Sequence, residues 1–200
     1  MPLFLSGNSG SATLDSSNGL IYPTWTTAGR PTSPATGQCG YNTSIGGMEI
    51  YNGSAWDCIT GGPAFSANGS GLQSLSSSTY TKIAYNTKIF DTANCFDATT
   101  NYRFTPNVTG YYQITVSCVF ASTSTVPMAV SIYKNGTQAT LASAYSGTAS
   151  SITINGASLM YMNGTTDYIE VYAYQGSAGS LNVGSDTSMR PFSAALIRSV

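Results

Sequence analysis

Few side chains in this sequence could carry out acid–base chemistry. The chain has eight carboxylates and no histidine, so a general base or a metal site would have to be built without imidazole. The carboxylates are scattered: Asp15, Glu49, Asp57, Asp91, Asp97, Asp167, Glu170 and Asp186. Asp167 and Glu170 are the one near pair, and Asp167 is better interpreted as a turn-capping residue than as half of a glycosidase pair.

The other reactive groups form no recognisable catalytic or cofactor motif. The serines have no base to activate them, and Gly69-Ser70-Gly71 lacks the following helix and lysine of a phosphate loop. The four cysteines are Cys39, Cys58, Cys95 and Cys118, without a Cys-x-x-Cys pair. Disulfides Cys39–Cys58 or Cys95–Cys118 are possible, but reduced thiols are expected without a secretory signal. We predict no enzymatic activity, cofactor or metal.

Charged residues are scarce, and this limits the classes of partner. They make up 8% of the 200 residues, and the net charge is -1. The absence of a basic stripe that could neutralise phosphates argues against a nucleic acid partner. No signal peptide and no run of the about 20 apolar residues that cross a bilayer are present, which argues against membrane insertion. We expect a soluble chain made in a cytosol, whose weakly charged surface packs against other subunits.

Residues 1–40 contain more large apolar side chains than a disordered tail needs. These side chains are Leu3, Phe4, Leu5, Leu20, Ile21, Tyr22 and Trp25. Prolines punctuate the segment 30–37, which is typical of extended chain. A disordered tail is the simpler alternative, but the apolar groups favour an arm that lies on a partner protein.

Residues 41–59 are predicted to form a small hairpin. Asn52-Gly53 is typical of a two-residue turn with positive φ angles. That turn would place Tyr51 opposite Ser54 and Glu49 opposite Trp56, with Tyr51, Glu49 and Trp56 on one face. A Glu beside a Trp is compatible with a sugar site, but a hairpin that packs its aromatic rings on a neighbouring protein is the more common case. The residues predicted to anchor the chain are Leu3, Phe4, Leu5, Tyr22, Trp25, Tyr51 and Trp56.

A second domain is predicted to begin at Pro63, after the boundary Gly61-Gly62-Pro63. Short strand candidates and turn signals follow without helical periodicity, which indicates an antiparallel sandwich. In the segment 110–120, Tyr112 and Ile114 alternate with polar residues in the period-two pattern of a half-buried strand. We therefore divide the chain into domains 1–62 and 63–200.

The segment 168–174 alternates in the same way. Ile169, Val171 and Ala173 would face the core, and three tyrosines would line the opposite side with Glu170. Solvent does not require a tyrosine stripe, whereas a subunit interface buries large rings and keeps their hydroxyl groups bonded. The predicted interface residues are Tyr112, Tyr168, Tyr172 and Tyr174.

Residues 63–200 resemble the globular head of complement C1q and the related tumour necrosis factor jelly roll. The motifs that carry the resemblance occur in the family's order. They are Pro63-Ala64-Phe65-Ser66-Ala67, Ile83-Ala84-Tyr85-Asn86, Phe96-Asp97, Phe104-Thr105-Pro106, Val108-Thr109-Gly110-Tyr111-Tyr112, Ser131-Ile132-Tyr133-Lys134-Asn135-Gly136, Asp167-Tyr168-Ile169-Glu170-Val171 and Phe192-Ser193-Ala194-Ala195-Leu196-Ile197. Ala194 and Thr166 depart from the family pattern, which has glycine at both. The resemblance implies an all-β antiparallel jelly-roll sandwich that forms compact homotrimers, with the Phe65 and Phe192 strands side by side.

Residues 26–57 resemble a module recurrent in virion proteins of tailed bacteriophages, especially fibres. The shared residues are Arg30-Pro31, Pro34, Gly37, Gly40-Tyr41-Asn42-Thr43 and Glu49-Ile50-Tyr51-Asn52-Gly53-Ser54-Ala55-Trp56. This resemblance implies that the extended arm and hairpin attach the chain to other virion structural proteins. No collagen-like Gly-x-y repeat precedes Pro63, so a complement role is not implied.

Together these features predict a non-enzymatic, homotrimeric structural protein on the virion surface of a tailed bacteriophage, made in the host cytoplasm. It would decorate the capsid or form a head fibre. The alternative is a tail-fibre adhesin that recognises host glycan or protein. A secreted ligand of the complement or tumour necrosis factor type is a third class, disfavoured by the missing signal peptide and stalk.

Overall fold

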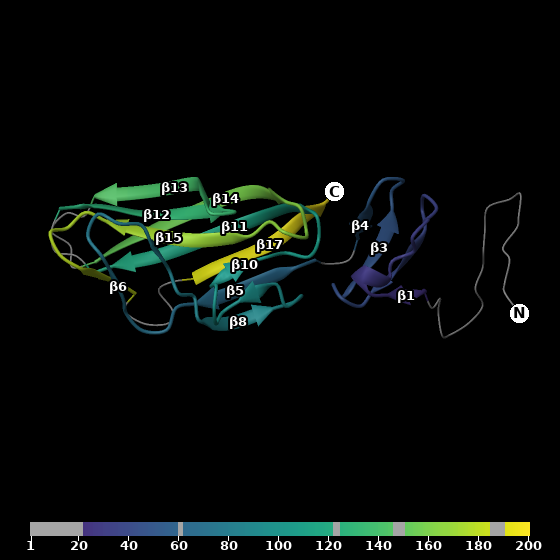
Figure 1. The fold of residues 1–200 in the computed structure, drawn as a ribbon, viewed down its shortest axis with the longest axis horizontal. Helices are drawn as coiled ribbons and strands as arrows, with labels where there is room; N and C mark the ends of the chain where they lie inside the picture. The colour runs from purple at the N-terminus through teal and green to yellow at the C-terminus, as the bar shows by residue number, and fades with distance from the viewer. Residues whose placement is uncertain (1–21, 60–61, 122–124, 146–150, 185–190) are drawn as a thin grey trace, which may run out of the picture.

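The computed structural model describes residues 22–59, 62–121, 125–145, 151–184 and 191–200. Nearly all of their regular structure is β (Figure 1). The described residues contain one 3-10 turn, Thr27–Gly29, and in this part of the chain no helix has the length and apolar character to cross a membrane. The chain is therefore an all-β protein, as the strand pattern predicts.

The N-terminal part forms a small sheet in the order β1-β2-β3-β4. Its strands are β1 (Thr24–Trp25), β2 (Cys39–Asn42), β3 (Gly47–Tyr51) and β4 (Trp56–Cys58). Strand β1 runs parallel to β2, and the indole of Trp25 lies on Gly40 of β2. A Cβ at position 40 would stand 2.2 Å from the Trp25 ring, so glycine is required for this close approach.

The β3–β4 hairpin differs from the predicted two-residue turn. Tyr51 pairs with Trp56 and Glu49 with Cys58, so the loop spans residues 52–55. The Asn52 side-chain oxygen accepts hydrogen bonds from the backbone N–H of Ser54 (2.9 Å) and Ala55 (2.8 Å). This side-chain cap stabilises the longer loop. The prediction that Tyr51, Glu49 and Trp56 share one face still holds, because the shift is by two residues.

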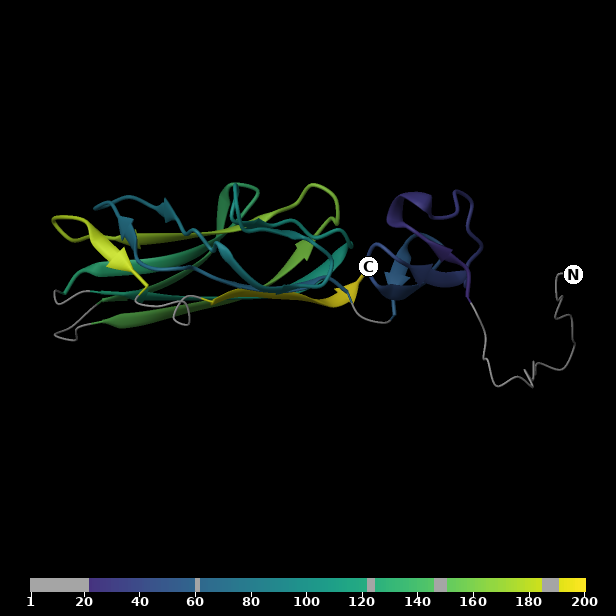
Figure 2. The same cartoon turned by 90° about the horizontal axis from the view of Figure 1, so that it is seen from below.

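The C-terminal part is a sandwich of two sheets, seen edge-on in Figure 2. We call the first the β11 sheet; it has seven strands in the order β6-β16-β11-β17-β5-β8, with β14 paired to β11. Its strands are β5 (Ala64–Asn68), β6 (Gln73–Leu75), β8 (Thr87–Asp91), β11 (Gly110–Phe120), β14 (Ile152–Met162), β16 (Leu181–Val183) and β17 (Pro191–Ser199). The first and last strands of the sandwich pair directly, with Phe65 opposite Ala194, as predicted.

We call the second sheet the β15 sheet. It has six strands in the order β13-β12-β15-β10-β9, with β7 paired to β15. Its strands are β7 (Thr81–Lys82), β9 (Phe96–Asp97), β10 (Arg103–Phe104), β12 (Pro127–Lys134), β13 (Thr137–Tyr145) and β15 (Ile169–Gln175). The β12–β13 loop is the two-residue turn expected of Asn135-Gly136, with φ angles of 51° and 77°.

The core between the sheets is centred on stacked aromatic rings. The Phe65 ring lies 4.5 Å from that of Phe96 and 4.8 Å from that of Phe192. Ile114 and Val116 of β11 point into this core, which confirms the predicted alternation. This packing fixes the two sheets face to face and leaves one outward side on each.

Tyr112 belongs to this core, which corrects its predicted place at a subunit interface. Its side chain is fully buried within the protomer, and its hydroxyl donates to the Val108 carbonyl oxygen at 2.8 Å. Tyr112 occupies an inward position of β11 beside Phe104, whose ring centroid lies 5.6 Å away. A period-two strand sends alternate residues to the same side, so Tyr112 follows Ile114 into the core.

The chain enters and leaves the sandwich at the end nearest the N-terminal sheet (Figure 1). The backbone N–H of Leu196 donates to the Pro63 carbonyl oxygen at 3.0 Å. Beyond it, the Ser199 hydroxyl accepts a hydrogen bond of 3.0 Å from the backbone N–H of Cys58 in β4. The end of β17 is thus the point of contact between the two parts, while a domain division at residues 62 and 63 stays a prediction.

Candidate functional site

The outward side of the β11 sheet has small side chains across its middle. Strand register places four small outward residues in one row, Ser66, Ser193, Thr115 and Ala157, and the row ends at Phe90 on β8. The hydroxyl oxygens of Thr115 and Ser193 lie 2.7 Å apart and satisfy each other. Beside this row, a depression of about 320 Å³ extends from Thr115 to Ala157 and Pro191. A flat surface of small residues allows another backbone to approach closely.

Larger apolar side chains stand on one side of this row and at its β8 end, where Phe90 lies. Tyr111 of β11 lies opposite Tyr161 of β14, with ring centroids 5.8 Å apart. Exposed fractions are 58% for Leu159, 44% for Tyr161 and 49% for Phe90. Among the described residues, register places one charged side chain, Arg198, on this side. We call the outward residues of β8, β5, β17, β11 and β14 the apolar face.

The outward side of the β15 sheet carries the predicted tyrosine stripe. Ile169, Val171 and Ala173 are fully buried, as predicted, so the intervening side chains point outward. Tyr80 and Tyr133 join the stripe from other segments. We call the outward residues Tyr80, Tyr133, Tyr168, Tyr172 and Tyr174, together with Lys82 and Glu170, the tyrosine face.

The rings of the tyrosine face contact one another. Tyr133 lies 4.3 Å from Tyr172, and Tyr80 lies 5.2 Å from Tyr174, measured between ring centroids. Tyr168 packs under the guanidinium of Arg103, whose carbon lies 4.5 Å from the ring centroid. Tyr133, Tyr168, Tyr172 and Tyr174 are half-buried in the protomer. Much of their ring surface is therefore already buried by contacts within one chain.

An ion pair completes the tyrosine face. The Lys82 ammonium lies 2.6 Å from the buried carboxylate of Glu170, which also accepts from the Tyr172 hydroxyl at 3.3 Å. Burial, followed by the negative charge of Glu170, raises the pKa of Tyr172 above its ordinary value. Burial and the neighbouring Tyr80 raise the pKa of Tyr133 in the same way. The face is an internally bonded layer rather than a set of free side chains.

In the N-terminal sheet, a buried carboxylate organises the predicted anchor residues. Glu49 accepts hydrogen bonds from Trp25 Nε1 (3.1 Å) and Asn42 Nδ2 (2.9 Å) and pairs with Arg30. Burial alone would raise the pKa of Glu49, but hydrogen bonds from Arg30, Asn42 and Trp25 outweigh it and lower that pKa. Every polar atom of Glu49 has a structural partner, which leaves no group free for the sugar site considered above.

The predicted anchor residues fall into three groups. Leu3, Phe4 and Leu5 lie outside the described residues. Trp25, Tyr51 and Trp56 are half-buried and pack together, with the Trp56 ring 5.0 Å from Trp25 and 5.5 Å from Tyr51. Tyr22 is 40% exposed, so of the anchor residues that the structure describes it offers the most free surface. Their role in anchoring stays a prediction.

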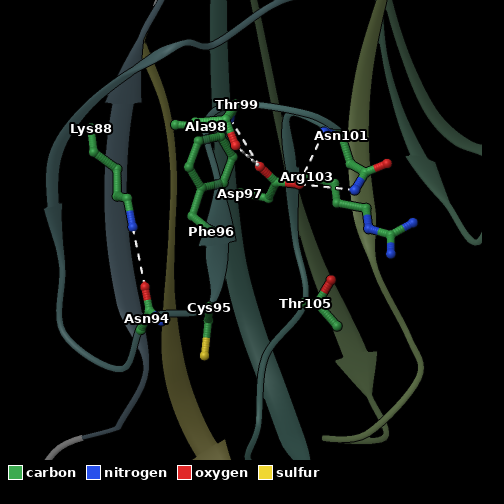
Figure 3. A pocket seen from close by; sticks show the side chains of 10 residues that line it. All are labelled: Lys88, Asn94, Cys95, Phe96, Asp97, Ala98, Thr99, Asn101, Arg103 and Thr105. Carbon is green, nitrogen blue, oxygen red and sulfur yellow. Dashed lines mark hydrogen bonds between the residues drawn. The ribbon is translucent and has the colours of Figure 1, made fainter.

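A polar pocket of about 430 Å³ lies between β8 and the β9–β10 loop (Figure 3). Lys88 and Asn94 line one wall, and Asn101 and Arg103 the other. Burial raises the pKa of the Cys95 thiol in this pocket to about 11, which keeps it protonated and unreactive at neutral pH. Within the described residues, no cluster of three or more acidic, cysteine or histidine side chains could hold a metal ion.

Asp167 has the turn-capping role that the sequence predicts. Its carboxylate accepts from the backbone N–H of Asn163 at 3.0 Å and from Asn135 Nδ2 at 2.7 Å, and it pairs with Lys134 at 2.9 Å. All four cysteines are in the thiol form. Neither Asp167 nor the thiols form part of a candidate catalytic arrangement.

The apolar face is the surface that sequence reasoning missed. The period-two pattern of residues 110–120 correctly assigns Gln113, Thr115 and Ser117 to the outward side. The exposed residues Leu159 and Tyr161 join them because β14 pairs with β11 across a long stretch of sequence. Their alternation with the half-buried Met160 and the buried Met162 was the available signal for an outward-facing apolar row.

No protein-family model and no curated protein matches this chain. Among solved structures, the globular domain of the zebrafish complement 1qA protein is 16% identical, with a TM-score of 0.50, over 69% of this chain and 99% of that one. Murine APRIL at pH 8.0 is 11% identical with a TM-score of 0.52, over 68% of this chain and 98% of that one.

The vertex protein P5 of PRD1 is also similar in structure. It is 15% identical, with a TM-score of 0.51, over 68% of this chain and 96% of that one. At these identities the similarity shows the fold, and the chain therefore has the jelly-roll fold of C1q and tumour necrosis factor heads. The phage-like module in residues 26–57 stays a prediction.

Proposed function

We propose that this chain is a non-enzymatic structural protein of a tailed-bacteriophage virion, displayed on the particle surface as a homotrimer. The apolar face carries this proposal. It combines exposed Leu159, Tyr161 and Phe90 with a nearly uncharged row of small residues. An uncharged core with aromatic residues is typical of a homo-oligomer interface. The similarity to the PRD1 vertex protein P5 supports a place on a virus particle.

A second copy of the chain is the occupant that best suits the apolar face. Repetition of the same face around a three-fold axis would cover it in every protomer without leaving an open edge. The C1q and tumour necrosis factor family that residues 63–200 resemble forms compact trimers, which supports this arrangement. The apolar face offers a better interface than the predicted tyrosine face, because the tyrosine rings already pack on each other. Tyr168, Tyr172 and Tyr174 would then remain on the outside of the trimer.

The N-terminal residues 1–62 would attach this trimer to other virion proteins. The C-terminal end of β17 contacts β4 through Ser199 and Cys58, so the arm and the head meet at one end of the sandwich. The opposite end would point away from the particle. Exposed Tyr22, at the start of the described chain, is the residue of this part best placed to contact the particle.

Light scattering of the purified full chain tests self-association, and we expect the mass of a trimer. A monomer at micromolar concentration would contradict the interface. Electron microscopy of intact particles tests location, with density for the head at capsid positions expected. Labelling confined to the tail would instead favour the fibre, and absence from particles would exclude a virion protein.

A host-binding adhesin is the second candidate function. The polar pocket of Figure 3 favours it, because a displayed head needs a ligand-sized polar site to recognise a glycan. A glycan screen with the full chain separates the two functions. Specific binding to host surface glycans supports the adhesin, whereas rebinding only to particles that lack the protein supports decoration.

A further inference from the structure

The pocket between β8 and the β9–β10 loop is lined mainly by polar groups. Its volume of about 430 Å³ lies within the range of small-molecule sites, about 300–1,000 Å³. The polar and charged lining residues are Lys88, Asn94, Asp97, Thr99, Asn101, Arg103 and Thr105. All of them come from one protomer, so the site requires no oligomer.

Arg103 has no polar partner at this pocket. It lies directly across the strand pair from Asp97, where an ion pair would be expected. Among the described residues, however, its guanidinium makes no hydrogen bond or ion pair and lies over the Tyr168 ring. That stacking orients the planar guanidinium and leaves its N–H groups free.

Asp97 does not pair with Arg103 because its carboxylate already accepts hydrogen bonds from its own loop. It accepts from the backbone N–H of Thr99 (2.9 Å), Thr100 (3.0 Å) and Asn101 (3.0 Å), and from Asn101 Nδ2 (2.8 Å). These backbone hydrogen bonds lower the pKa of Asp97 well below its usual value. Figure 3 shows hydrogen bonds from Thr99 and Asn101 converging on the Asp97 carboxylate. The loop is therefore held in place without help from Arg103.

The opposite wall offers hydrogen-bonding groups for a polyol. Lys88 Nζ donates to Asp91 Oδ2 at 3.0 Å and to Asn94 Oδ1 at 3.3 Å, which leaves one of its three N–H groups available. Asn94 and Thr105, each with a polar side chain, also line the pocket. Lys88 and Arg103 are balanced by Asp91 and Asp97, so charge alone does not select a ligand, and an anion that binds must also match the hydrogen-bonding groups of the pocket.

From this arrangement we infer that the pocket binds a carboxylated sugar, such as a uronic or sialic acid unit of a surface polysaccharide. The carboxylate would receive the two parallel N–H groups of the Arg103 guanidinium, a geometry for which arginine is suited and lysine is not. The sugar hydroxyl groups would bond to Lys88, Asn94 and Thr105. This inference goes beyond the proposed structural role, because it assigns a ligand to the displayed head and depends neither on the trimer nor on the particle.

The test is a titration of the full chain, followed by NMR, with glucuronate, galacturonate and N-acetylneuraminate. We expect saturable binding of at least one of them at millimolar concentrations, with shifts at Arg103 and Thr105. Glucose, the neutral counterpart of glucuronate, lacks the carboxylate, and inorganic phosphate lacks the sugar hydroxyl groups. Each should therefore bind at least about tenfold more weakly. Equal binding of phosphate would overturn the inference, as would saturation by none of the three acids.

Two variants locate the site. Arg103→Lys keeps the charge but removes the planar pair of donors and should weaken binding about tenfold or more. Thr105→Val keeps the shape, removes one hydroxyl, and should weaken binding by a smaller factor while leaving the thermal unfolding temperature close to wild type. Arg198→Ala, which removes a guanidinium outside the pocket, is the control. Unchanged affinity in both folded pocket variants would place the ligand elsewhere and contradict the proposal.

Discussion

The two outward faces of the sandwich are both rich in tyrosine, but they use it differently. On the tyrosine face, rings contact rings, and the Tyr172 hydroxyl is bonded to Glu170, which pairs with Lys82. On the apolar face, Leu159 and Tyr161 project from β14 with about half of their surface free. The first face is stabilised within one chain, whereas the second still has apolar area to bury.

This difference shows that aromatic content alone does not identify an interface. The relevant quantity is the ring surface and polar groups left without a partner in the protomer. Tyr80 comes from a segment that lies over the β15 sheet, and it packs on the rings of Tyr133 and Tyr174. The sequence pattern alone would leave these rings exposed. No equivalent side chain covers the row from Phe90 to Ala157 in the described part of the molecule.

The largest expected effect comes from a charge placed on the apolar face. Leu159→Glu should dissociate the trimer, because like charges repeated in an apolar interface cost several kcal/mol, or about 100-fold or more in affinity. Leu141→Glu is a matched control, since Leu141 is similarly exposed (54% against 58%) but lies on β13 of the other sheet. Light scattering of both variants gives the comparison. Dissociation by Leu141→Glu alone would reverse the assignment of the two faces.

The second effect concerns the ion pair of the tyrosine face. Lys82→Met should lower the free energy of unfolding by about 1–3 kcal/mol, because it leaves the buried Glu170 carboxylate without its charged partner. The trimer mass should not change. Lys88→Met should lower the free energy of unfolding by a smaller amount, because Asp91 retains hydrogen bonds from the backbone N–H of Cys95 and Phe96. Urea unfolding measures both variants. A dissociated but equally stable Lys82→Met protein would contradict the internal role of this face.

A smaller effect separates two individual tyrosines. Tyr80→Ala should lower protomer stability by about 1–2 kcal/mol, because its ring packs on Tyr133 and Tyr174. Tyr161→Ala should change protomer stability less and weaken assembly instead. Protomer unfolding is best measured in the Leu159→Glu background, where stability no longer depends on assembly. Equal effects of both substitutions on both measurements would remove the distinction between the faces.

Much of the fold follows from local sequence pattern. The alternation in residues 110–120 and 168–174 correctly separates inward from outward side chains, and Asn135-Gly136 predicts its turn. The pairing of the Phe65 and Phe192 strands follows from the resemblance to jelly-roll heads. These features depend on period-two geometry and turn chemistry, which neighbouring residues specify.

The candidate surfaces depend on contacts between distant segments, and these were harder to predict. The same alternation that buries Ile114 also directs Tyr112 into the core. The prediction of Tyr112 at an interface was therefore inconsistent with the pattern of its own strand. The loop at residues 52–55 is longer than predicted because the Asn52 side chain caps it. The free guanidinium of Arg103 results from the hydrogen bonds that Asp97 makes within its loop, which no residue spacing reveals.

Alkaline titration provides the finest test of the difference between the faces. Burial and then Glu170 raise the pKa of Tyr172, so folding favours its neutral phenol. This contribution to stability is fully present below the ordinary tyrosine pKa of about 10, and it is lost as the pH rises through the raised value in the folded state. The free energy of unfolding should therefore fall above about pH 10.

Tyr172→Phe removes this titrating group, so its free energy of unfolding should fall less steeply over the same range. Urea unfolding at a series of pH values, with tyrosinate absorbance recorded in parallel, measures the slope. The hydroxyl's bond to Glu170 is lost at every pH and lowers the whole curve without altering its slope. Identical slopes for wild type and variant would mean that Tyr172 is as open to solvent in the folded chain as in the unfolded one. The tyrosine face would then have exposed ring surface of its own. The predicted interface at Tyr168, Tyr172 and Tyr174 would again be a candidate, beside the apolar face.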